Sequence, residues 1–242
     1  MRLQLPTTRT LLALVAAAGL ATLPAVVAAD PCVQPDASGT VNMPPQGCPY
    51  VSPATFHQIV NGLPLGTTIN VGAEHQKFFN VTRGPGGSLG GEFERFDSIG
   101  LLHLQGTGTL LGFERFMNIP LQCETHVGPR TPGQPIQSFP TDMFMMQGQV
   151  IGDPDFDLLR IIAGTAFGMP SPGHTTLTQQ GPNWDVDSFF DIEYRIDFVG
   201  APGSVLSGRS GSTTATIRMQ AGEHPVAVEP NSWGNVKKRF RD

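Results

Sequence analysis

Short apolar runs broken by glycine and proline dominate the chain from about residue 54 to residue 228. Several have the length of a β-strand, including QIVNGL, TTINVG, KFFNVT and STTATIRMQAG, and turn-forming stretches such as residues 83–87 and 200–203 separate them. The 3.6-residue period of an amphipathic helix is nearly absent, although DFDLLRIIAGTAF is compatible with a helical turn. The pattern predicts an all-β fold, either an antiparallel β-sandwich or a sandwich-like barrel.

The clearest strand is DSFFDIEYRIDF, which begins at Asp187. Apolar and charged residues alternate strictly from Phe190 to Phe198, so one face of this strand is apolar and the other carries only charged side chains. The favoured interpretation is a solvated sheet face with charge partners on neighbouring strands. In the alternative, carboxylates such as Asp187, Asp191, Glu193 or the Asp153 group are the catalytic acids and bases of a hydrolase, and a second strand must contribute to the site.

The N-terminus has the pattern of a secretory signal peptide over residues 1–29. Arg2 and Arg9 precede an apolar core from Leu11 to Leu23, and Val27-Ala28-Ala29 offers small residues for cleavage. We therefore expect a secreted protein, extracellular or periplasmic, without a transmembrane segment after signal removal. The mature part divides into a Pro/Gly-rich lead-in (30–53), one β domain (54–228) and a basic tail (229–242).

Charge argues against nucleic acid as a partner. The formal net charge is −5, and removal of the signal peptide with its two arginines makes it −7. A mildly acidic chain without a basic patch does not fit a phosphate backbone, and the one basic run, KKRFRD, is interpreted as a solvated tail.

Three cysteines remain in the mature chain. In an oxidising compartment Cys32 and Cys48 would close a loop of about 15 residues and contribute roughly 3 kcal/mol to stability. This pairing leaves Cys123, which would then be buried or would link two chains; a pairing of Cys123 with Cys48 is the alternative.

Alternate aspartates in GDPDFD suggest one cofactor. Asp153, Asp155 and Asp157 can converge on Ca²⁺, which prefers several oxygen ligands, although the EF-hand spacing is not met. The other interpretation is a set of turn-forming aspartates. No other cofactor is expected.

Two further features bear on function. Trp184 is the one aromatic residue in a polar loop that a glycan-binding module would expose as a ligand contact, so its burial would count against such a module.

Gly86-Gly87-Ser88-Leu89-Gly90 matches the G-x-S-x-G string of serine hydrolases. It precedes an apparent strand instead of a helix, so a flexible hairpin loop is favoured and no catalytic residue is assigned.

Four pieces resemble a β-rich module of secreted bacterial proteins: ERFDSIGLLHLQGTG, FPTDMFMMQGQV, MPSPGHTTLT and VDSFFDIEYRIDFVGAPGSVLSG. The Pro-Ser-x-Gly-x-Thr-Thr turn and the Asp-Ser-Phe-Phe-Asp strand entry are the most specific. The resemblance covers about half the chain and implies a secreted β-sandwich-like domain, but no activity. Relatives often end in an apolar helix and a basic end, whereas this chain ends NSWGNVKKRFRD, without the helix.

Taken together, these patterns favour a secreted, non-enzymatic β-sandwich protein with a structural or interaction role in the cell envelope or extracellular matrix. The alternatives are a hydrolase of extracellular polymers and a glycan-binding module, either of them with or without structural calcium.

Overall fold

The computed structural model describes residues 32–35, 45, 47–52 and 57–221 of the chain. The predicted signal peptide (1–29), most of the lead-in and the basic tail (229–242) lie outside the described residues. Among the described residues, no helix is long and apolar enough to cross a bilayer.

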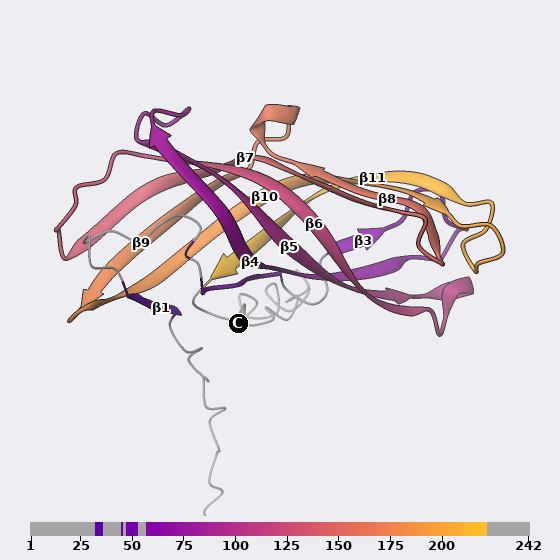
Figure 1. Cartoon of the computed structure of the whole chain (residues 1–242). Helices are drawn as coiled ribbons and strands as arrows, with labels where there is room; N and C mark the ends of the chain where they lie inside the picture. Colours follow the sequence, from indigo (N-terminus) through magenta and orange to yellow (C-terminus); the bar gives the residue numbers. More distant parts are fainter. Residues whose placement is uncertain (1–31, 36–44, 46, 53–56, 222–242) are drawn as a thin grey trace, which may run out of the picture.

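Antiparallel strands account for 68% of the structure and single-turn 3₁₀ helices for 3%, which confirms the all-β prediction (Figure 1). Turns and loops make up the rest of the described residues. The elements are β1 (Cys32–Pro35), β2 (Tyr50–Val51), β3 (His57–Ile59), β4 (Ile69–Pro85), β5 (Glu92–Gly106), η1 (Gly108–Leu110), β6 (Glu114–Val127), β7 (Ile136–Ile151), β8 (Phe156–Ala163), η2 (Thr165–Phe167), β9 (Pro172–Gln180), β10 (Asn183–Gly200) and β11 (Ser210–Ala221).

The strands form one curved sheet that closes on itself. Strands β4 to β7 follow one another as a meander, and β7 pairs with both β8 and β9, which pair in turn with the two halves of β10. β10 pairs with β11, β11 with the short β2, and β2 with β4. β3 pairs with β4 beside β2, and the turn after β3 contacts β11 through the Asn61 side chain, which donates to the Ser212 carbonyl at 2.8 Å. The ring therefore closes through short strands from the start of the chain.

The core fills the inside of this ring. Apolar side chains from β4, β5, β6, β7, β8, β10 and β11 surround an apolar internal cavity of about 60 Å³. That space holds at most a few water molecules, so the interior is a packed core. Along β10 every second residue from Trp184 to Phe198 is buried, as the alternating pattern predicted for its second half.

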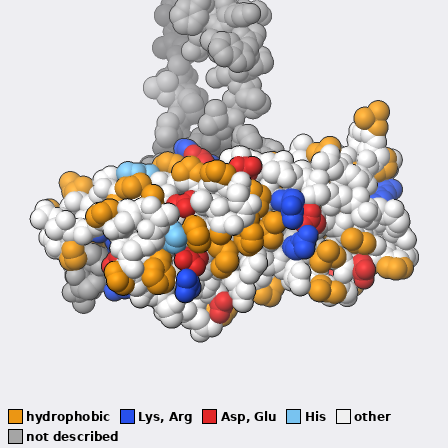
Figure 2. Space-filling view, turned by 90° about the horizontal axis from the view of Figure 1, so that it is seen from above, with side chains coloured by type: hydrophobic (Ala, Val, Ile, Leu, Met, Phe, Trp, Pro, Cys, Tyr) orange, Lys and Arg blue, Asp and Glu red, His pale blue; other side chains and the backbone are white. Residues whose placement is uncertain are grey.

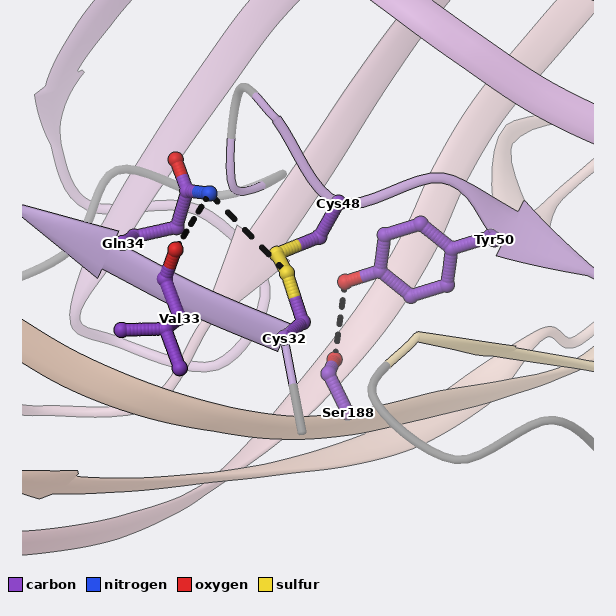
Figure 3. Close-up of a disulfide and its surroundings, with 6 residues drawn as sticks. All are labelled: Cys32, Val33, Gln34, Cys48, Tyr50 and Ser188. Atoms are coloured by element: carbon purple, nitrogen blue, oxygen red, sulfur yellow. Dashed lines mark hydrogen bonds between the residues drawn. A yellow bond between two sulfur atoms is a disulfide. The ribbon is translucent and has the colours of Figure 1, made fainter. Parts of the chain in front are cut away.

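The sheet begins before residue 54. Cys32–Pro35 pairs with β10, and Tyr50–Val51 pairs with β4 and β11, so two pieces of the expected lead-in are strands of the fold. The predicted disulfide between Cys32 and Cys48 is confirmed and joins these two pieces (Figure 3). Next to it, Tyr50 donates a hydrogen bond to the buried hydroxyl of Ser188 at 2.9 Å (Figure 3). Disulfide and tyrosine together fix the lead-in against the ring.

The segment DFDLLRIIAGTAF, whose sequence is compatible with a strand or a helical turn, contains one of each. Residues 156–163 are the strand β8, with alternate residues buried, and residues 165–167 are the single turn η2. Branched residues in the first part favour the strand. Gly164 and Gly168 have positive φ angles of 107° and 73°, a conformation that glycine adopts without steric cost, and they bound the turn.

Candidate functional site

A groove of about 580 Å³ crosses the outer face of the sheet over β4 to β8. Its axis follows the pairing direction, because its wall includes successive cross-strand neighbours: Phe79, Asp97, Gln122, Gln147 and Ile162. Neighbouring strands lie about 4.8 Å apart, so this row spans roughly 19 Å. A second row beside it includes Pro120, Gln149 and Arg160. We refer to these eight side chains as the outer groove.

The aromatic wall of the outer groove is held in place by an irregular backbone. β4 pairs with β5 through two register shifts, one on each side of Phe79. Within this stretch Lys77 and Asn80 have φ angles of 57° and 53°, a left-handed conformation that is uncommon outside glycine. The shifts leave the Phe79 side chain 44% exposed. Strain of this kind persists where the surrounding structure enforces it, and it is found preferentially at functional positions.

The charges in the outer groove are balanced. Asp97 accepts a hydrogen bond from the Asn80 side chain at 2.8 Å, and Arg160 forms an ion pair with Asp197 at 2.7 Å. Between them, the amide of Gln147 donates to that of Gln122 at 3.3 Å. Charged side chains of opposite sign also lie beside one another on the face of the molecule that Figure 2 shows. The groove thus offers amides, one aromatic ring and little net charge.

A second feature lies on the same outer face, at the loop between β4 and β5. The loop carries the Gly-rich string and is a hairpin connection, as predicted. It packs against β6, where Ser88 meets His126: Oγ lies 2.8 Å from Nδ1, and the Ser88 backbone N–H donates to the same nitrogen at 3.0 Å. Gly87 has a φ of 84°, and a Cβ at this position would lie 3.0 Å from the imidazole Cγ, so the close approach requires glycine.

Carboxylates surround His126. Its Nε2 lies 3.0 Å from Oε1 of Glu124, whose Oε2 accepts from Arg95 Nε at 2.8 Å. Burial opposes ionisation of Glu124, but the hydrogen bonds from Arg95 and His126 outweigh it and hold the pKa of Glu124 below its ordinary value. Asp142, the cross-strand neighbour of His126 on β7, also interacts with the imidazole and with Ser88. We call Ser88, Glu124, His126 and Asp142 the Ser88 cluster.

Burial of Asp142 raises the pKa of its carboxyl above the ordinary value, because the hydrogen bonds that it accepts do not compensate for lost hydration. One of these bonds comes from Thr165 in η2, at 2.9 Å. The β4–β5 loop projects from the upper side of the sheet in Figure 1, and so does η2. Phe144 stacks on the imidazole of His126 with ring centroids 4.1 Å apart. His126 is therefore enclosed on several sides, while Ser88 remains exposed.

The aspartates expected to bind calcium face a cation of the protein itself. Arg115 of β6 lies 2.8 Å from Asp153 and 3.3 Å from Asp155, and Asp157 is exposed. Asp153 also accepts the backbone N–H of Asp155, as a turn-forming aspartate does. No group of three or more His, Cys, Asp or Glu side chains among the described residues is arranged to hold a metal ion. The calcium prediction finds no support here.

The charged side chains of β10 lie along its outer face, as the solvated-face interpretation predicted. Asp191 pairs with Arg218 of β11 at 2.7 Å, and Asp197 pairs with Arg160 of β8 and with Arg195. Each of these carboxylates thus has an arginine partner, mostly on a neighbouring strand. Of the β10 carboxylates named for the hydrolase alternative, Asp191 is paired with Arg218, and Asp187 and Glu193 lie on the same outer face.

Trp184 was expected to be an exposed ligand contact, and this prediction is wrong. Only 1% of Trp184 is accessible. It is the first of the alternate buried residues of β10, and β1 and β9 pair with β10 on its two sides. The apparent polar loop around it is part of the β9–β10 hairpin, whose tight turn the sequence did not distinguish from a longer loop. Cys123, in turn, is free and buried, which was one of its three expected fates.

Comparison with known proteins adds no relative: no family model, no curated protein and no solved structure matches this chain. The outer groove and the Ser88 cluster therefore rest on geometry alone. Sequence reasoning missed both, since their members come from strands whose register no local pattern gives. The signals in the sequence were the Gly-rich string and the alternate spacing of Glu124 and His126, which places both side chains on one face of a strand.

Proposed function

We propose that this is an exported interaction protein that binds a neutral extracellular polysaccharide across the outer groove. The observation that carries the proposal is Phe79, a large apolar side chain that two register shifts hold 44% exposed at the wall of a polar groove. An aromatic ring offers a rigid apolar surface at low entropic cost, and it suits the apolar face of a sugar ring.

The rest of the groove supports the same chemistry. Gln122, Gln147 and Gln149 carry both donors and acceptors, which suit hydroxyl groups. Asp97 accepts a hydrogen bond from the neutral Asn80, Arg160 is paired with Asp197, and the two charges of the groove have opposite signs, so the groove favours an uncharged ligand over an anion or a cation. A row of roughly 19 Å suits several units of an extended polymer better than one small molecule. Burial of Trp184 removes the platform that sequence suggested, and Phe79 takes that role in this proposal.

Location in the envelope or matrix follows from the same proposal. The disulfide between Cys32 and Cys48 fits an oxidising compartment, extracellular or periplasmic. Polysaccharides are abundant there, and a scaffold with a groove on one face can attach to them. This agrees with the interaction role that the sequence patterns favoured.

The test is co-sedimentation of the mature protein with insoluble cellulose, chitin and α-glucan, followed by titration calorimetry with soluble fragments of the polymer that retains it. Phe79→Ala should weaken binding by about tenfold or more, which corresponds to about 1.4 kcal/mol. Phe116→Ala is the matched control, since Phe116 is 73% exposed but does not line the groove. Failure of all three polymers to retain the protein, or equal binding by both variants, would overturn the proposal.

A further inference from the structure

We propose that Ser88, His126 and Glu124 form a nucleophilic centre that hydrolyses carboxylic esters, an activity separate from binding in the outer groove. A serine becomes a nucleophile when a base lies within hydrogen-bonding distance and a third group orients the base. Ser88 Oγ lies 2.8 Å from Nδ1 of His126, and Nε2 of the same ring lies 3.0 Å from Glu124. The same order of groups recurs on unrelated folds, so it is recognised by geometry and not by topology.

The hydrogen bonds fix the protonation that a base needs. A backbone N–H can only donate, so the bond from Ser88 N to Nδ1 makes Nδ1 an acceptor without a proton. The neutral imidazole then carries its proton on Nε2 and donates it to Glu124. The Ser88 N–H and the Ser88 hydroxyl share the one lone pair of Nδ1, and the hydroxyl also interacts with Asp142. Donation from the hydroxyl to Nδ1 is the direction required for proton abstraction.

Charge around the ring stabilises the imidazolium that the reaction forms. Glu124 lies directly on Nε2, and Arg95 holds that carboxylate in place through its other oxygen. Asp142 provides a second acidic group on the strand opposite His126. Phe144 stacks on the ring, so the base is shielded from water while the nucleophile is exposed.

The reaction balances with water as the only co-substrate. Ser88 Oγ attacks the ester carbonyl carbon, its proton passes to Nδ1, and the C–O bond to the alcohol breaks as that proton passes to the leaving oxygen. Water then attacks the acyl-serine, gives a proton to Nδ1, and the carboxylic acid leaves as Ser88 regains its proton. When Nδ1 is protonated it no longer accepts from the Ser88 N–H, which becomes free to donate to the oxyanion beside it.

Two other serine–histidine pairs in the described part of the chain lack one of these features. Ser98 and His75 lie 2.6 Å apart but are buried, so no substrate reaches them. Ser138 and His174 lie 2.7 Å apart on the surface, but no described carboxylate hydrogen-bonds to His174. Ser138 is thus a matched control within the same molecule.

The experiment is covalent labelling of the mature protein with a fluorophosphonate probe, followed by intact mass and peptide mapping. Attack by Ser88 forms an Oγ–P bond and releases fluoride, and the serine proton leaves through His126. We expect one label, at Ser88, that Ser88→Ala abolishes and Ser138→Ala leaves unchanged. Because a general base contributes about 10²–10⁴-fold, His126→Gln should slow labelling by about 100-fold or more, and Glu124→Gln by a smaller factor.

Three outcomes would overturn the proposal: no label at Ser88, equal labelling of Ser88 and Ser138, or an unchanged rate in both His126→Gln and Glu124→Gln. His126 is buried, so its variant must first show the wild-type circular dichroism spectrum. If it does not, Glu124→Gln alone decides, by whether it slows labelling of Ser88 while it keeps the wild-type circular dichroism spectrum.

Discussion

At the scale of single residues, the buried group of His75, Ser98 and Cys123 shows how the interior suppresses reactivity. Cys123 Sγ lies 3.6 Å from Ser98 Oγ and 3.8 Å from His75 Nε2, a constellation that on a surface would suggest a thiol nucleophile. Burial lowers the pKa of His75 to about 4 and raises the pKa of Cys123 to about 12. Both groups are therefore neutral at pH 7, and the contact is structural.

The lowered pKa of His75 predicts a specific acid sensitivity. Below pH 6.5 the unfolded chain binds a proton at His75, whereas the folded protein does so only near pH 4, so stability falls as the pH decreases through this window. Between pH 7 and pH 4.5 the wild type should lose about 2 to 3 kcal/mol more stability than His75→Gln. Urea unfolding of both proteins at the two pH values measures this difference. Equal losses would show that His75 does not carry the acid sensitivity.

At the scale of elements, the connection between β7 and β8 shows how one residue from a third strand decides what a loop does. Within the loop, Asp153 N–H donates to the Phe156 carbonyl at 2.9 Å, which closes a tight turn. The turn brings Asp153 and Asp155 together, and Arg115 of β6 forms an ion pair with each of them. The carboxylates attach the loop to β6, and among the described residues no group of three or more His, Cys, Asp or Glu side chains could hold a metal ion.

We therefore expect calcium to leave the thermal melt unchanged. A site with a dissociation constant near 10 μM would add about 2.7 kcal/mol at a hundredfold excess, and raise the melting temperature of a domain this size by roughly 5 to 10 °C. The wild type in millimolar calcium and in chelator should melt within about 1 °C of each other. A larger shift that the double change Asp153→Asn and Asp155→Asn abolishes would restore the calcium interpretation.

At the scale of the whole molecule, the start of the chain completes the ring. β2 lies between β11 and β4, and β1 extends the edge of β10. The disulfide ties β1 to the segment before β2, and Tyr50 reaches Ser188, which also lies 2.7 Å from Thr175 Oγ1. A covalent constraint at this position limits the freedom of the segment whose pairing closes the fold.

Loss of the disulfide should consequently destabilise the entire ring. The double change Cys32→Ser and Cys48→Ser should lower the free energy of unfolding by about 3 kcal/mol, measured in urea without reductant. Reductant should bring the wild type to the same value and leave the double variant unaffected. A wild type that reductant does not destabilise would mean that Tyr50 and the strand pairings suffice to hold the segment.

Prediction from sequence succeeded where one strand contains its own pattern. β10 alternates so regularly that its buried face, from Phe190 to Phe198, follows from the side-chain period alone. Prediction failed where the answer depends on a partner: Trp184 precedes the strictly alternating part, and its burial depends on pairing with β1 and β9. The contacts of Ser88 with His126 likewise depend on how the hairpin loop packs against β6, which no local pattern specifies.

Ring closure between the early strand β2 and the last described strand, β11, has a consequence for how the protein is made. β11 is the last strand of the described chain, and it must meet β2, from near the beginning. Until then the sheet that runs from β4 through β7 and β8 to β10 is open, and its unpaired edges on β4 and β10 can pair with other chains. Such distant contacts form slowly. Under the proposed export, the fold is completed only after β11 has crossed the membrane, and maturation then depends on protection from aggregation during that interval.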